Sequence, residues 1–160
     1  MLKEYEIGWF EEPLPYDDLE SYVLLREQSP VPIAAGEALT RRQSFQPFID
    51  RHAFDIVQPD TTKVGGLSEA RRIAWAAYDH GLEFVSHGWN TAVGVCADLH
   101  LAAAIPGARL VEFQTGSSYI EGISKTEFKL DQDGCLQVPT GPGLGIELDL
   151  ERIRQRTSSS

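Results

Sequence analysis

Five short runs rich in branched or aromatic residues recur along this chain, and longer stretches with helical periodicity separate them. The runs span residues 7–10, 32–35, 54–57, 82–85 and 110–113. Each run is too short for a helix and has the composition of a β-strand. A crossover between parallel strands needs about a dozen residues, which the intervening stretches provide. The alternation therefore predicts an α/β fold with parallel strands.

Four helices are expected between these runs. The first is predicted to begin at a capping box made by Asp17 and Glu20, and the second at a similar box that opens with Thr40. The third follows Gly66, and the fourth follows Thr91, a residue that can cap a helix. Helical spacing of apolar residues predicts that the following side chains face the core: Tyr22, Val23, Phe45, Phe48, Ile49, Ala70, Ile73, Ala74, Ala77, Val95, Cys96, Leu99 and Ala103.

A polar side chain that can carry chemistry stands at the end of each strand-like run. These positions are 23 to 27 residues apart, and they are Glu11, Glu37, Asp60, His87 and, within the fifth run, Glu112. Because ligands bind at the carboxyl ends of parallel strands in both open sheets and barrels, the five side chains are expected to converge on one site. The chain contains no glycine-rich phosphate-binding turn, which an open sheet usually carries. The ring of strand-end side chains therefore favours a barrel.

The acids of this ring predict a bound metal ion. Several carboxylates at one mouth repel each other and are costly to desolvate, so together they favour a cation. Oxygen ligands from Glu11 and Glu37 suit Mg²⁺, which few carboxylates hold together with waters and substrate oxygens. Zinc is disfavoured, because the imidazole of His87 has another role. The alternative interpretation is that the strand-end acids only cap the helices that follow them.

His87 is the candidate base. Asp60, on the adjacent strand end, could accept a hydrogen bond from one ring nitrogen, fix the tautomer and raise the basicity of the other nitrogen. Such a pair beside a metal-bound carboxylate can remove a proton from the adjoining carbon, because the metal stabilises the enediolate that forms. Glu112 in its protonated form could donate a hydrogen bond to that enediolate. Lys63 could stabilise an anionic substrate or Asp60, or it is a solvated lysine.

Composition excludes several classes of function. The chain has 160 residues, with 14 Lys and Arg against 24 Asp and Glu and a formal charge of −10, so it lacks the basic excess that nonspecific nucleic-acid binding needs. No apolar run reaches 18 residues, which predicts no membrane span, and the charged start does not match a signal peptide. We therefore expect a cytoplasmic protein. Cys96 and Cys135 have no metal or redox spacing and are interpreted as structural or incidental.

At these residues the sequence resembles the enolase superfamily, in particular its mandelate racemase/muconate-lactonizing enzyme group. Ordered segments over nearly the whole chain carry the resemblance: WFEEPLP (9–15), PIAAGE (32–37), QPDTTKVGG (58–66), SHGWN (86–90), LVEF (110–113) and PTGPGLGIE (139–147). Any one of these segments alone would be a weak signal, but their order and spacing together are specific.

The resemblance implies a partial TIM (β/α) barrel over residues 1–119, corresponding to strands four to eight of the family's barrel. Residues 120–150 would form a tail that in the family packs toward a capping domain, and residues 151–160 are expected to be disordered. The capping domain has no counterpart in this chain. Apolar tail positions would then lack their packing partner and form an exposed patch: Phe128, Leu130, Leu136 and Val138.

The resemblance also implies a set of metal ligands. Glu11 resembles the second ligand of the family, with Glu12 as its neighbour, and Glu37 resembles the third. The first ligand, an Asp on the family's third strand, has no counterpart in this sequence. The isolated chain is therefore expected to bind Mg²⁺ weakly or not at all, and to be inactive alone.

Asp60 and His87 resemble the catalytic dyad of the racemase-like subgroup, and Glu112 resembles its carboxylate-polarising acid. The resemblance implies a Mg²⁺-dependent lyase that abstracts the proton α to a carboxylate and dehydrates a small sugar acid. Two alternatives stay open: a racemase, epimerase or cycloisomerase of the same superfamily, and a non-catalytic partial barrel. Because five strands cannot close a barrel, the open edges predict a homo-oligomer.

Overall fold

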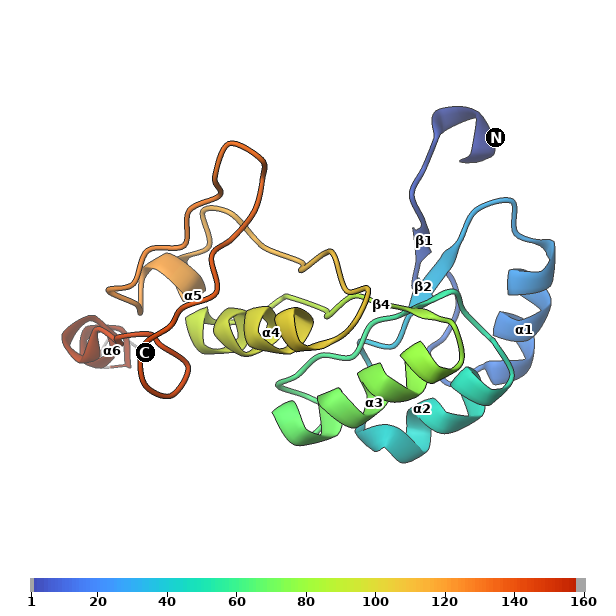
Figure 1. Cartoon of the computed structure of the whole chain (residues 1–160), viewed down its shortest axis with the longest axis horizontal. Coiled ribbons are helices and arrows are strands. Elements are labelled where there is room, and N and C mark those ends of the chain that lie inside the picture. Colours follow the sequence, from blue (N-terminus) through green and yellow to red (C-terminus); the bar gives the residue numbers. More distant parts are fainter. Residues whose placement is uncertain (1, 158–160) are drawn as a thin grey trace.

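Four parallel strands in the order β1-β2-β3-β4 form the central sheet of the computed structural model, which describes residues 2–157 (Figure 1). The strands are β1 (Phe10–Glu11), β2 (Ile33–Ala35), β3 (Ile56–Val57) and β4 (Glu83–Phe84). Sequence order equals spatial order, and every neighbouring pair is parallel. This is the arrangement of consecutive β/α units, and it confirms the α/β fold of a partial barrel.

Six α-helices and a short 3-10 helix surround or extend this sheet within residues 2–157. They are η1 (Leu2–Tyr5), α1 (Leu19–Gln28), α2 (Arg41–Asp50), α3 (Leu67–Asp79), α4 (Ala92–Ala104), α5 (Ser118–Glu121) and α6 (Leu150–Thr157). In Figure 1, α1, α2 and α3 lie near the strands, whereas α5 and α6 lie at the opposite end of the molecule beyond α4. Within residues 2–157 no helix combines the length and apolar character needed to cross a bilayer.

The sheet has two differently covered faces because strand side chains alternate. One face contributes Ile33, Ala35 and Val57 to the main core, where they pack with helix residues such as Phe45 and Ile73. The other face carries a small buried cluster: Ala34, Ile56 and Val85, with Trp9 packed against it. This second face is the one that would line the interior of a closed barrel.

The fifth expected strand is reduced to a single parallel bridge between Ser86 and Val111. Leu110, which precedes the bridge, is 46% exposed. Within residues 2–157 the segment pairs with one neighbour only, so few ladder hydrogen bonds extend it. The prediction of a strand over 110–113 is therefore right in position and direction and wrong in extent.

The helix boundaries agree with the predictions, but the capping does not. Asp18, not Asp17, is the N-cap of α1, and its carboxylate accepts a hydrogen bond from the Ser21 backbone N–H at 3.1 Å. Thr40 and Thr91 precede α2 and α4 as expected, yet neither side chain makes a capping hydrogen bond. The predicted core faces of α2 and α3 are buried as expected. Two predicted core positions are not fully buried: Val23 is partly buried and Ala103 is exposed.

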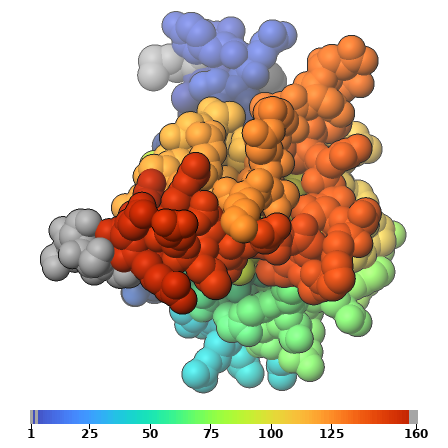
Figure 2. Space-filling view, turned by 90° about the vertical axis from the view of Figure 1, so that its left-hand side faces the viewer, coloured from blue at the N-terminus to red at the C-terminus, as the bar shows by residue number. Residues whose placement is uncertain are grey.

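Several apolar side chains of the tail, residues 120–150, are packed against the rest of the chain. Phe128, Leu136 and Val138 pack against a cluster built by α4 and α5, so the prediction that they would be exposed is wrong. Leu130 is 48% exposed, as expected for this part of the patch. Figure 2, which views the molecule from the left-hand side of Figure 1, shows the tail in orange to red spread over that side.

Residues 151–157, predicted to be disordered, belong to helix α6 instead. The Asp149 carboxylate accepts a hydrogen bond from the Arg152 backbone N–H at 3.0 Å near the start of this helix. Arg156 donates from Nη1 to the carbonyl oxygen of Ser118 at 3.1 Å. The contact between Arg156 and Ser118 docks α6 on α5, which the sequence pattern could not reveal. Residues 158–160 of the same prediction lie outside the described residues.

Candidate active site at the strand ends

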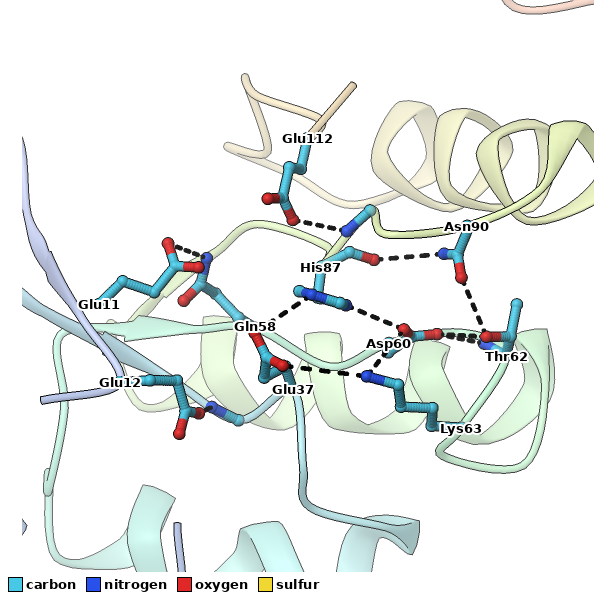
Figure 3. Close-up of polar contacts among 12 residues, drawn as sticks. Glu11, Glu12, Glu37, Gln58, Asp60, Thr62, Lys63, His87, Asn90 and Glu112 are labelled. Atoms are coloured by element: carbon cyan, nitrogen blue, oxygen red, sulfur yellow. Dashed lines mark hydrogen bonds and ion pairs between the residues drawn. The ribbon is translucent and has the colours of Figure 1, made fainter. Parts of the chain in front are cut away.

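The carboxyl ends of the four strands bring the predicted side chains together (Figure 3). Glu11 ends β1, Glu37 lies two residues beyond β2, and Asp60 and His87 each lie three residues beyond β3 and β4. The parallel register aligns these ends, since Glu11 pairs with Ala34 and Val57 with Phe84. Hydrogen bonds and ion pairs then join Glu37, Asp60 and His87 directly.

His87 stands between two carboxylates. Its Nδ1 lies 2.9 Å from Oδ2 of Asp60, and its Nε2 lies 3.1 Å from Oε2 of Glu37. The residue is 5% exposed. Burial acts to lower the pKa of His87, but the hydrogen bond with Asp60 and the charges of Glu37 and Glu112 outweigh it and raise the pKa above its ordinary value of 6.5. The arrangement favours a basic imidazole that holds a proton tightly.

Asp60 is the fully buried partner of this pair. Its Oδ1 accepts hydrogen bonds from the backbone N–H of Thr62 at 2.8 Å and from the Thr62 hydroxyl at 2.6 Å. Burial acts to raise the pKa of Asp60, but the hydrogen bonds with His87 and Thr62 and the charge of Lys63 lower it to about 2. Asp60 is therefore an anion that orients the imidazole through Nδ1.

Lys63 lies between two acids of the site. Its Nζ is 3.5 Å from Oδ2 of Asp60 and 3.9 Å from Oε1 of Glu37, and its side chain is 45% exposed. Of the roles expected from the sequence, these contacts support the stabilisation of Asp60. The exposed amino group also leaves a positive charge at the mouth.

Glu112 approaches from the segment that follows α4. Its Oε2 accepts a hydrogen bond from the backbone N–H of Gly88 at 2.6 Å. Gly88 has no space for a side chain, because an added Cβ would lie 2.2 Å from the carbonyl oxygen of Glu112. The absence of a Cβ at Gly88 therefore lets the Glu112 segment approach the His87 loop, and the Gly88 N–H holds the Glu112 carboxylate there. The sequence analysis missed this requirement.

The three predicted metal ligands differ in their surroundings. Oε2 of Glu11 accepts hydrogen bonds from Nε1 of Trp9 at 2.8 Å and from Nε2 of Gln58 at 3.1 Å. Glu12 has a positive φ of 42°, and its Oε1 accepts a hydrogen bond from the backbone N–H of Gly36 at 2.8 Å. Figure 3 shows Glu12 turned away from His87. Burial and the neighbouring acids raise the pKa of Glu12 despite that hydrogen bond.

The donor set fits Mg²⁺ in kind but supplies only part of a site. Glu11 and Glu37 offer carboxylate oxygens from adjacent strand ends, the hard ligands that Mg²⁺ prefers. Within residues 2–157, however, no group of three or more His, Cys, Asp or Glu side chains is arranged to hold an ion. Water, substrate and other ligands would have to complete the coordination.

Three polar residues of the site were not identified as functional from the sequence. Gln58 is 2% exposed and contacts Glu11, Thr62 contacts Asp60, and Asn90 lies within 3.0 Å of the Thr62 hydroxyl. Gln58 directly follows β3, a position that could have drawn attention to it. Thr62 and Asn90 lie in loops, where no periodicity marks them.

A hollow of about 440 Å³ lies beside the dyad. It is lined by Thr62, Trp89, Asn90, Thr91, Gln114 and Tyr119. Hydroxyl and amide groups line it together with two exposed aromatic rings, Trp89 at 71% and Tyr119 at 66% exposure. Such a lining can hydrogen-bond hydroxyl groups and cover an apolar face of a small molecule.

Comparison with known proteins shows what this chain is similar to. The sequence matches the family described as Enolase C-terminal domain-like over residues 1–153. It is 32% identical to the D-galactarolactone cycloisomerase of Agrobacterium fabrum, over 94% of this chain and 42% of that protein. It is 31% identical to the D-xylonate dehydratase of Haloferax volcanii, over 95% of this chain and 37% of that protein.

Solved structures give the same result. The fold matches the mandelate racemase/muconate lactonizing enzyme from Sulfitobacter sp. with a TM-score of 0.89 and 34% identity, over 96% of this chain and 38% of that chain. The chain thus spans about two-fifths of the length of the relatives it matches.

Proposed function

Because this chain belongs to the enolase C-terminal domain-like family, we propose that the protein containing it is a Mg²⁺-dependent lyase that dehydrates a sugar acid. The observation that carries the proposal is the buried His87–Asp60 pair at 2.9 Å, which opens on a mouth lined by Glu11 and Glu37. Relatives named D-xylonate dehydratase and D-galactonate dehydratase support the substrate class.

His87 is the proposed proton carrier. Asp60 holds Nδ1, so Nε2 is the nitrogen that exchanges a proton with the substrate. Dehydration removes the proton from the carbon next to the carboxylate and breaks the C–O bond of the adjacent carbon. His87 acts either as the base that takes the first proton or as the acid that protonates the departing hydroxyl. Its raised pKa suits both steps, since a general acid–base group works best when its pKa lies near the working pH.

Glu11 and Glu37 are the proposed metal ligands on this chain. A bound divalent cation supplies positive charge that stabilises the negative charge developing on a substrate carboxylate. Lys63 adds a second positive charge at the mouth and neutralises part of the repulsion between Asp60 and Glu37. Glu112, whose carboxylate is held by the Gly88 N–H, lies across His87 from Glu37. It is proposed to contact the substrate carboxylate.

The substrate is proposed to be a small polyhydroxy carboxylic acid. The hollow beside the dyad presents Thr91 and Gln114, groups that can hydrogen-bond the hydroxyls of such a chain. Trp89 can cover one face of the carbon chain.

A panel of aldonic and aldaric acids tests the proposal. The full-length protein that contains this chain is incubated with each acid and Mg²⁺, and the 2-keto-3-deoxy product is measured. The same reaction with a chelator is the matched blank. We expect at least one acid to give product only when Mg²⁺ is present. Racemisation of an α-hydroxy acid without dehydration of any acid sugar would contradict the proposal.

A cycloisomerase is the second candidate. The observation that favours it is the 32% identity with a D-galactarolactone cycloisomerase, whose name assigns a lactone substrate to that protein. Such a reaction uses the same removal of a proton next to a carboxyl carbon. Lactones added to the panel separate the two. Removal of the proton with cleavage of the ring C–O bond at the adjacent carbon gives a keto-deoxy acid isomeric with the lactone, and this product without dehydration of any open-chain acid would favour the second candidate.

A further inference from the structure

Asp98 is a buried acid that the proposed mechanism does not use. It lies on α4, it is 0% exposed, and its Oδ2 accepts a hydrogen bond from Nδ2 of Asn90 at 3.1 Å. Its other oxygen, Oδ1, is buried without a hydrogen-bond partner among the described residues. A half-satisfied buried carboxyl is costly, so its position calls for a physical reason.

A continuous series of hydrogen bonds leads from Asp98 to His87. Asn90 Oδ1 lies 3.0 Å from the Thr62 hydroxyl, and that hydroxyl lies 2.6 Å from Oδ1 of Asp60. Oδ2 of Asp60 then lies 2.9 Å from Nδ1 of His87. Figure 3 shows the part of this series from Asn90 to His87.

Gly94 brings Asn90 close to α4. A Cβ added at Gly94 would lie 2.5 Å from the Cβ of Asn90, a distance that real side chains do not adopt. The first turn of the helix therefore has a glycine where the Asn90 side chain packs on it. This close packing places the amide within reach of Asp98, one turn further along.

The hydrogen bonds in this series can run in more than one direction, depending on where the Thr62 hydroxyl proton points. A threonine hydroxyl has one proton, so Thr62 can donate to Asp60 or to Asn90 but not to both. When the Asn90 amide turns its oxygen toward Thr62, the two acceptors compete for that proton. When it turns its nitrogen toward Thr62, the amide becomes the donor and the Thr62 proton belongs to Asp60. The group that fixes the orientation of the Asn90 amide therefore decides how strongly the Thr62 hydroxyl donates to Asp60.

We propose that Asp98 is a positioning residue for the His87–Asp60 pair, acting by fixing the orientation of the Asn90 amide and thereby the hydrogen bond from Thr62 to Asp60. The inference rests on the proposed function of the dyad and adds a residue of α4 to it. Asp98 contacts neither His87 nor Asp60 by any hydrogen bond of the described residues. The Asn90 amide connects it to both, through Thr62 to Asp60 and through the contact of Nδ2 with the carbonyl oxygen of His87 at 3.4 Å.

The charges around Asp98 agree with this role. Burial raises the pKa of Asp98 to about 8, although the hydrogen bond from Asn90 acts in the opposite direction. The charged groups that act on it are Asp60, Glu112 and His87. A carboxyl oxygen can accept from Nδ2 of Asn90 whether or not the group keeps its proton, so Asp98 holds the amide nitrogen and leaves the amide oxygen facing Thr62.

Nuclear magnetic resonance of the ¹⁵N-labelled chain tests the proposal without any substrate. The readouts are the ring nitrogens of His87 and the side-chain amide of Asn90. Asp98→Leu keeps the branched shape of the side chain and removes the acceptor, whereas Asp98→Asn keeps an acceptor and a donor. We expect Asp98→Leu to shift both sets of signals, and Asp98→Asn to restore the His87 ring signals. Cys96→Ala, a buried change on the same helix, is the control and should leave the ring signals unchanged.

A second variant covers the case in which Asp98→Leu does not fold. Asn90→Ala breaks the series at a half-buried loop position and should shift the His87 ring signals in the same direction. When both single variants fold, the double variant should shift these signals no further, because both changes break one path. Unchanged His87 ring signals in folded Asp98→Leu or in Asn90→Ala would overturn the proposal. Loss of turnover in the acid panel would instead bear on the proposed function alone.

Discussion

His87 is held at both ring nitrogens by acids, and this environment controls its charge. Asp60 is buried and anionic, Glu37 is half-exposed, and both raise the pKa of the imidazole against the effect of burial. A histidine whose pKa is raised in the folded protein contributes stability below its unfolded pKa of about 6.5, and this contribution is lost as the pH rises through the folded value.

The pH dependence of unfolding tests this environment. We expect His87→Gln to lower the free energy of unfolding more at about pH 5.5 than at about pH 8.5, measured by urea denaturation of both proteins. In an Asp60→Asn background the difference should depend less on pH, since Asp60 provides the main interaction that raises the pKa of His87. A His87→Gln effect that is constant over this range would contradict the account.

The contribution of Asp60 to stability depends on pH in the opposite direction. Its pKa is about 2 in the folded protein against an ordinary value of 3.8, so its contribution is present above pH 3.8 and is lost as the pH falls through about 2. The His87 experiment therefore lies in a range where Asp60 stays ionised.

Gly88 offers a second test at the scale of one residue. Gly88→Ala should destabilise the chain by about 1–3 kcal/mol, because the new Cβ would overlap the carbonyl oxygen of Glu112 and force the two segments apart. Gly8→Ala is the matched control, since no atom lies within 4 Å of a Cβ added there. Equal midpoints of urea unfolding for the two variants would show that the Glu112 segment is not held by this contact.

Sequence reasoning identified the charged members of the site and missed their polar supports. Glu11, Glu37, Asp60 and His87 follow strands, and the rule that parallel strand ends converge was enough to group them. Thr62 and Asp98 gave no comparable signal, because one lies in a loop and the other on a helix whose buried face is otherwise apolar. Their connection to the dyad becomes visible only in the folded structure.

Helices α1 to α4 were located correctly from periodicity, while local capping depended on details that the pattern does not contain. Two adjacent acids precede α1, and either could have served as its N-cap. The backbone places Asp18 at the cap, where its carboxylate reaches the Ser21 N–H.

The cap of α1 is tested by a pair of substitutions. Asp18→Ala should lower the free energy of unfolding by about 1 kcal/mol, the usual effect of losing an N-cap side chain. Asp17→Ala removes an exposed acid of the same charge and should have a much smaller effect. If thermal or urea unfolding ranks the two variants in the reverse order, the assignment of the cap is wrong.

The strand at 110–113 and helix α6 mark where element-scale prediction failed, for opposite reasons. The strand composition was right, but a strand needs partners, and only the Ser86–Val111 bridge forms. The α6 segment is polar and charged, and its docking through Arg156 and Ser118 is a long-range contact that no local pattern predicts.

At the scale of the whole molecule, the sheet ends in an exposed edge. Strand β1 has a neighbour only on the β2 side within residues 2–157, and Phe10 on this strand is 41% exposed. An unpaired edge with apolar side chains is a template for another strand. The partial barrel is therefore proposed to associate with itself through this edge and through the 110–113 segment.

Size-exclusion chromatography with light scattering measures that association. The isolated chain is expected to elute as a dimer or larger oligomer, and Phe10→Lys should shift it toward the monomer by charging the edge. Tyr119→Lys, which charges a more exposed aromatic position away from the strands, is the control. A clean monomer for the unsubstituted chain would contradict the proposal.

The proposed role of His87 is to transfer a proton at Nε2 during the dehydration, either from the carbon next to the substrate carboxylate or to the departing hydroxyl. Proton NMR of a reactive acid sugar in D₂O follows the C2 proton directly, in the encoded protein with Mg²⁺ and in its His87→Asn variant. We expect the C2 signal to disappear in the presence of the native protein, and to disappear about 10²–10⁴-fold more slowly with the variant. A C2 signal that disappears equally fast in both proteins would contradict this role.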